Sequence, residues 1–146
     1  MKKLFTIFIL CIFSGISSSF AQIVVSQGIV ETNLDVSNAT TVAQVTLNAP
    51  ATGKVIVHFD GLCTSSVGDR IVLAASNTLD TWSSNDGNVN IEVPNTDQNS
   101  NSFSHTRVYD VTAGSHTFYA VVQNYVETDG SGLASIYGNL TAKFIP

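Results

Sequence analysis

The chain has 146 residues, of which 44% are hydrophobic and only 12% are charged, and its formal net charge at pH 7 is −5. This length suits a single domain. The acidic balance argues against nucleic acid and anionic membranes as partners, because both are bound through clustered Lys and Arg side chains.

The first predicted element is a secretory signal peptide, residues 1–21. Lys2 and Lys3 form its positive start, an apolar run follows at 4–13, and a small-residue cleavage signature ends at Ala21. The apolar run is shorter than the roughly 20 residues that span a bilayer. We therefore expect export without membrane insertion, and the form of this leader is typical of bacteria.

The remaining part, residues 22–146, is expected to be one secreted or periplasmic domain. Loss of the two leader lysines leaves four basic residues against eleven acidic ones, a formal charge of −7. Cys63 is then the only cysteine, so an internal disulfide is impossible. A buried free thiol and an intermolecular bridge both remain open for Cys63.

Eight strands follow in chain order, because apolar and polar residues alternate with a period of two almost throughout. Turn-forming Gly, Pro, Asn and Asp residues separate these runs. The predicted strands are residues 23–30, 41–48, 54–60, 70–76, 88–93, 103–111, 116–125 and 134–145. This number and spacing of strands predict an all-β, antiparallel β-sandwich, most simply a jelly roll.

The strand predicted at residues 116–125 has apolar side chains on both faces. Phe118 and Val122 share one face, whereas Tyr119 and Val121 lie on the other. A strand of this kind lies centrally in its sheet, or its second face meets another subunit. Self-association into a homo-oligomer is therefore expected.

The connections between strands alternate between the two ends of an antiparallel sandwich. The first end then collects several acidic and amide side chains, and the second end holds the long connection around Trp82. The first group is residues 61–69, 94–101 and 126–132, and the second group is residues 49–53, 77–87 and 112–115.

Four segments resemble the complement-head and tumour necrosis factor-like jelly-roll superfamily. The run from Gly53 to Phe59 is similar to its glycine-led central strand, and the likeness continues at residues 103–105. Residues 111–118 are similar to its hydrophobic-x-x-Gly-x-x-x-hydrophobic hairpin, and residues 140–144 to its closing strand. The resemblance covers nearly the whole mature chain. It implies a trimeric, non-enzymatic head with a binding or structural role.

A carbohydrate site is suggested by Trp82, the only tryptophan of the chain, which lies among polar residues. An aromatic ring offers an apolar face together with a polar handle. The alternative is that Trp82 covers the open end of the core. The candidate ligand-binding residues are Trp82, Asp80, Asn85, Asp86 and Tyr125.

A calcium site is suggested by Asn95, Asp97 and Asn99, which place oxygen ligands at alternate positions. Glu127 and Asp129 belong to the same predicted end of the sandwich. A solvated turn without an ion is the alternative, since these residue types favour turns on their own account. Calcium is the one possible cofactor.

Catalytic motifs are missing from the sequence: it has no nucleophile elbow, no zinc-protease signature and no phosphate-binding glycine loop. His58 and Asp60 share one strand face, as a hydrolase pair or as a solvated polar pair. We therefore expect a non-enzymatic protein with a structural, adhesive or partner-binding role, and a carbohydrate-binding module is the alternative. The expected partners are further copies of the chain, a trimer above all, and a glycan or cell-surface molecule.

Overall fold

The computed structural model describes residues 22–84, 87–93, 100–127 and 130–146. The predicted signal peptide lies outside these residues. All eight predicted strands are present, and several are longer than their alternation indicated. They are β1 (Val24–Asp35), β2 (Thr40–Ala49), β3 (Gly53–Ser65), β4 (Arg70–Ser76), β5 (Val89–Glu92), β6 (Ser100–Val111), β7 (Gly114–Val126) and β8 (Leu133–Ile145).

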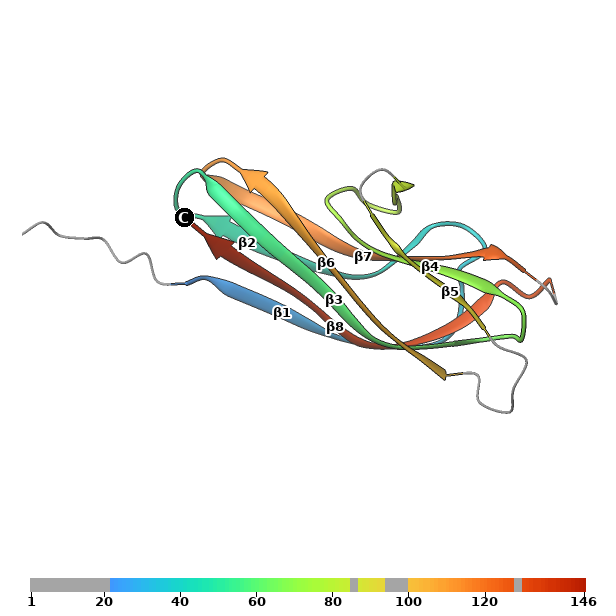
Figure 1. Cartoon of the computed structure of the whole chain (residues 1–146). Coiled ribbons are helices and arrows are strands. Elements are labelled where there is room, and N and C mark those ends of the chain that lie inside the picture. Colours follow the sequence, from blue (N-terminus) through green and yellow to red (C-terminus); the bar gives the residue numbers. More distant parts are fainter. Residues whose placement is uncertain (1–21, 85–86, 94–99, 128–129) are drawn as a thin grey trace, which may run out of the picture.

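The strands form two four-stranded antiparallel sheets that pack face to face (Figure 1). Sheet A has the order β1-β8-β3-β6, and sheet B has the order β2-β7-β4-β5. Every connection except that between β4 and β5 crosses from one sheet to the other. Eight strands wound in this way are a jelly roll, which confirms the predicted fold class.

The connection at residues 112–113 differs from the expected hairpin. Strands β6 and β7 do not pair with each other, because β6 pairs with β3 in sheet A and β7 pairs with β2 and β4 in sheet B. The turn therefore crosses between the sheets. Gly114 permits this with a φ of 128°, a conformation that side chains rarely adopt.

Apart from the segment 77–84, the described connections follow the predicted alternation between the two ends of the sandwich. At the first end, the Val36 N–H donates to the Gly132 carbonyl at 2.9 Å, and the Ser65 hydroxyl donates to the Leu133 carbonyl at 2.7 Å. At the other end, Ala49 pairs with Gly114.

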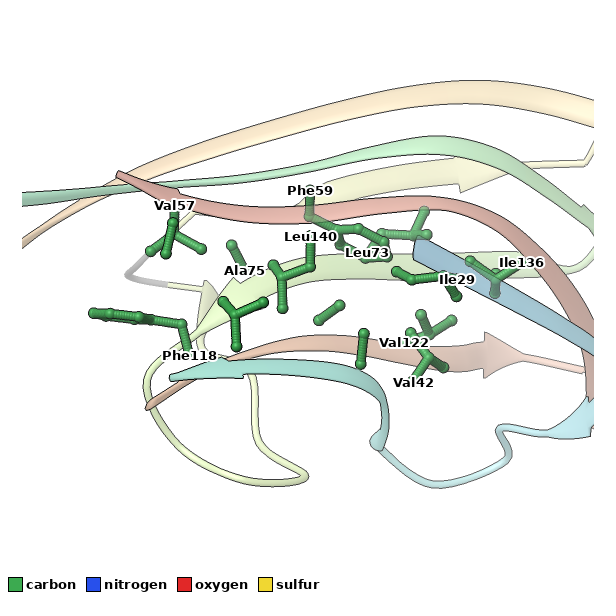
Figure 2. Close-up of a cluster of buried hydrophobic side chains, with 14 of the residues drawn as sticks. Ile29, Val42, Val57, Phe59, Leu73, Ala75, Phe118, Val122, Ile136 and Leu140 are labelled. Atoms are coloured by element: carbon green, nitrogen blue, oxygen red, sulfur yellow. The ribbon is translucent and has the colours of Figure 1, made fainter. Parts of the chain in front are cut away.

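The main core lies between the sheets and is built from the inward-facing half of each alternating strand. Figure 2 shows Val57, Phe59 and Leu140 of sheet A facing side chains of sheet B, among them Phe118 and Val122. All five are nearly or fully buried. Burial of each such side chain stabilises the fold by about 1.5–3 kcal/mol.

Cys63 is a free cysteine that is fully buried in this core. Burial raises the pKa of its thiol to about 12. The thiol is therefore inert and inaccessible to a second chain, as the buried-thiol interpretation expected.

Residues of sheet A complete the hydrogen bonding of β4 beyond its short partner β5. Strand β5 pairs with β4 only as far as Leu73. At Ala75 the N–H donates to His105 Nδ1 and the carbonyl accepts from the Tyr109 hydroxyl, both at 2.9 Å. Two side chains of β6 thus replace a missing strand at this edge.

Among the described residues, no helix has the length and apolar character needed to cross a membrane.

Candidate functional site

The outer face of sheet B carries a second, smaller apolar layer. Val72, Ala74 and Val121 point away from the main core, yet each is at most 1% exposed. Ala74 and Val121 are direct partners across β4 and β7. The segment 77–84 does not stay at the second end but folds back onto this face, where Asp80 bonds to Thr41 of β2 and Trp82 bonds to Gln123 of β7. The second apolar face of β7 is thus covered by the same chain rather than by another subunit.

Asp80 anchors this covering segment to β2. Its Oδ1 accepts the N–H of Thr41 at 2.8 Å, and its own N–H donates to Thr41 Oγ1 at 3.0 Å. Asp80 has a φ of 47°, which Asp tolerates better than most residues with a Cβ. Asp80, which was predicted as a ligand-binding residue, therefore has a structural role: it holds the segment 77–84 against β2.

Trp82 lies half-buried against the outer face of sheet B and does not cover the end of the core. Its Nε1–H donates to Gln123 Oε1 at 2.7 Å, which orients the indole. The ring meets Tyr125 edge to face, with centroids 6.4 Å apart and planes at 79°. The fold thus brings together two predicted ligand-binding residues, Trp82 of the long connection and Tyr125 near the end of β7.

Tyr125 borders a shallow pocket of ≈ 420 Å³ whose other lining residues are Arg70, Asn90, Ile91 and Glu92. Arg70 and Glu92 face each other across β4 and β5, and their side chains form an ion pair at 3.2 Å. Both side chains are well exposed, so the pair adds at most about 1 kcal/mol to stability. We call Trp82, Tyr125, Arg70, Asn90 and Glu92 the aromatic site.

The aromatic site offers one exposed tyrosine ring together with hydrogen-bond donors and acceptors. Tyr125 is 65% exposed although a second ring braces it. The Arg70 guanidinium supplies donors, the Glu92 carboxylate supplies acceptors, and the Asn90 amide supplies both. Sequence reasoning missed these three residues, because nothing in the sequence showed that β4 pairs with β5 at this register.

The predicted calcium residues fall largely outside the part of the chain that the structure describes. This holds for Asn95, Asp97, Asn99 and Asp129, and also for the candidate sugar ligands Asn85 and Asp86. Glu127 is exposed just beyond β7. In the described ranges, no three His, Cys, Asp or Glu side chains gather as a metal site would require.

A buried polar cluster lies beneath this first end of the sandwich. Asp69 is fully buried, and its Oδ2 accepts the Ser65 hydroxyl at 2.6 Å and the Asn124 amide at 2.7 Å. The cluster joins β3, the start of β4 and β7. Its hydrogen bonds indicate a structural role, since buried polar groups are costly unless they are paired.

His58 and Asp60 lie on the outer face of sheet A. His58 Nδ1 is 2.7 Å from Thr106 Oγ1, and Nε2 is 3.5 Å from Asp60 Oδ1. All three residues are on paired strands, and the neighbouring N–H groups of β3 face β6 and β8 in the ladders. The His58 and Asp60 side chains are 40% and 42% exposed and form a polar pair at the surface.

Neither a protein-family model nor a curated protein matches this chain. Solved structures that it resembles include VP2 of infectious bursal disease virus in a subviral particle, at 8% sequence identity and a TM-score of 0.46. The match covers 85% of this chain and 32% of the VP2 chain. The chain therefore spans about a third of that protein, and the likeness concerns the fold alone.

Proposed function

We propose that this protein is a secreted, non-enzymatic binding protein with an adhesive role, and that it binds a carbohydrate at the aromatic site. One observation supports this most. An exposed tyrosine ring, braced by the only tryptophan, borders a pocket lined by an ion pair and an amide. Exposed aromatic and charged groups arranged in this way add little to stability and suit recognition.

A sugar ring would place its apolar C–H face on Tyr125. Its hydroxyl groups would then exchange hydrogen bonds with Arg70, Glu92 and Asn90, which supply donors and acceptors side by side. The positive charge of Arg70 is balanced by Glu92 at 3.2 Å, and the mature chain is acidic. The site therefore favours neutral sugars over anionic ones.

Retention on immobilised neutral polysaccharides tests this proposal. We expect Tyr125→Ala to abolish retention and to leave the melting temperature almost unchanged, because this side chain is mostly exposed. Leu79→Ala is the matched control: Leu79 is also a large, exposed apolar side chain, and it does not line this pocket. Equal retention of the wild type and Tyr125→Ala would refute the proposal.

A structural homo-oligomer, with a trimer favoured, is the second candidate. It is supported by the positions of the segments that resemble the complement-head and tumour necrosis factor-like superfamily. Gly53 opens β3, which lies between β8 and β6 inside sheet A. A Cβ on Gly53 would lie 2.5 Å from the Ile145 carbonyl, so the close approach of β8 requires glycine. Light scattering of the mature chain measures its mass and tests for a trimer. A change in this mass on addition of calcium would support a calcium site.

A further inference from the structure

The outer face of sheet A is divided into rows by the strand register. Val30, Tyr137 and Leu62 are direct neighbours across β1, β8 and β3 and form the first row. All three are exposed, Val30 to 73%. A row of adjacent, exposed large apolar side chains is unusual on a solvated sheet and marks an interaction surface.

A second apolar row lies six residues away along the strands. It contains Val24, Ile56 and Val108, with Lys143 between Val24 and Ile56. Val24 and Val108 are each at least half exposed. At a rise of about 3.3 Å per residue, the two apolar rows are about 20 Å apart.

Two polar rows separate the apolar ones. The row next to Val30 contains Asp60 and Asn139, and the following row contains His58 and Thr141. Along the strands, the four rows therefore follow the order apolar, polar, polar, apolar. This order is the same from either end, so a second copy rotated by 180° about an axis across the strands presents apolar rows to apolar rows.

The charges on this face also suit a second copy. Lys143 and Asp60 lie within these rows, and Lys54 and Asp110 pair in the next row beyond Ile56. The four charges cancel at neutral pH, in a mature chain whose formal charge is −7. The rotation places Asp60 of each copy opposite His58 of the other. Two acidic molecules can thus approach through a face that is locally neutral and complementary.

The size of the face is adequate for a stable contact. Strands β3 and β8 each have 13 residues. Four strands of about this length, spaced about 4.8 Å apart, cover roughly 800 Å², which is the area that each partner buries in a standard interface. Figure 1 shows β1, β8, β3 and β6 as one continuous layer.

We propose that the outer face of sheet A binds a second copy of this chain, face to face, about a two-fold axis perpendicular to the strands. Leu62 then packs against Ile56 of the second copy, and Val30 packs against Val24. This proposal gives the homo-oligomer candidate a dimer in place of the favoured trimer. It does not depend on carbohydrate binding at the aromatic site, which lies on the opposite sheet.

Sedimentation of the mature protein at micromolar concentration tests the contact. We expect a dimer, and at least a tenfold weaker association for Val30→Glu and for Leu62→Glu. Leu79→Glu is the matched control: Leu79 is an apolar residue of similar exposure outside this face, and its substitution should leave the mass unchanged. Circular dichroism checks that each variant is folded, and binding of a short neutral oligosaccharide, which occupies one site only, should be equal in all three.

Cross-linking tests the direction of the axis. In one chain, Ile56 and Leu62 are about 20 Å apart on β3, too far for an internal disulfide. Under mild oxidation, the double variant Ile56→Cys, Leu62→Cys should form a covalent dimer, and Leu62→Cys alone should not. A monomeric wild type, a trimer, or a dimer unaffected by Val30→Glu and Leu62→Glu would overturn the proposal.

Discussion

His105 of β6 connects the two facing sheets through a hydrogen bond that requires a neutral imidazole. Its Nδ1 accepts the Ala75 N–H, so this nitrogen must be unprotonated in the folded protein. Burial, followed by the charges of Arg107 and His58, lowers the pKa of His105 below its ordinary value of 6.5. Protonation would replace an acceptor with a second donor aimed at the same N–H.

The expected consequence is a loss of stability in mild acid. In the unfolded chain His105 takes up a proton at about pH 6.5, whereas in the folded chain it does so only at lower pH. Its contribution is therefore complete above about pH 6.5 and declines as the pH falls through the folded pKa. Urea unfolding at a series of pH values between 7 and 5 measures this decline.

His105→Leu should remove that part of the pH dependence. It should also cost about 1–3 kcal/mol at pH 7, because the Ala75 N–H would lose its partner. His116→Gln is the control, since His116 lies at the surface and bonds to the Thr112 carbonyl. A pH profile of His105→Leu that parallels the wild type would show that the imidazole does not act in this way.

At the scale of elements, the strands were predictable and their partners were not. Alternation located all eight strands, because one face of each is buried whichever strand lies beside it. Pairing depends on contacts between distant residues, such as Gly61 with Gly138, which local patterns do not encode. The fold-back of the segment 77–84 was missed for the same reason: it rests on bonds from Asp80 and Trp82 to residues about 40 positions away.

Strands β3 and β8 approach so closely at Gly61 and Gly138 that neither position has room for a side chain. A Cβ on Gly138 would collide with the Asp60 carbonyl. Gly138→Ala should therefore destabilise the protein by about 1–3 kcal/mol or more. Gly28→Ala is the control, because the nearest atom to its Cβ would be 3.9 Å away. Denaturant midpoints compare the two, and equal midpoints would contradict the packing described for β3 and β8.

Asp80 should control whether the segment 77–84 stays on sheet B. Asp80→Ala removes the acceptor for the Thr41 N–H and suits a positive φ less well, so we expect a loss of about 1–2 kcal/mol. Trp82 should then become more exposed, and its fluorescence emission should shift to longer wavelength. Asp80→Asn retains both the oxygen and the tolerance of this conformation, and its emission should stay close to that of the wild type.

At the scale of the whole molecule, the two outer faces of the sandwich differ. The middle of the outer face of sheet B is buried under its own chain, with the aromatic site at one corner, whereas sheet A leaves two apolar rows and a polar centre exposed. The sequence predicted that apolar surface was in excess and nominated Trp82 and Tyr125. It did not show which sheet would leave apolar side chains exposed on its outer face, because this depends on how the chain segments cross between the two sheets.

Because the two faces are separate, the proposed carbohydrate binding and the proposed dimer are compatible in one assembly. If sheet A joins two copies, the aromatic sites lie on the outside of the dimer and stay open to solvent. Two weak sugar sites then act together on one polysaccharide, which raises the apparent affinity without any new contact.

The most direct test of the central claim is to map a neutral oligosaccharide onto the full mature chain by NMR. Amide and side-chain shifts should change at Tyr125, Arg70, Asn90 and Glu92, together with the indole N–H of Trp82, and should titrate with a single dissociation constant. Unchanged signals at these five residues over a panel of neutral oligosaccharides, or changes confined to the outer face of sheet A, would contradict the proposed function.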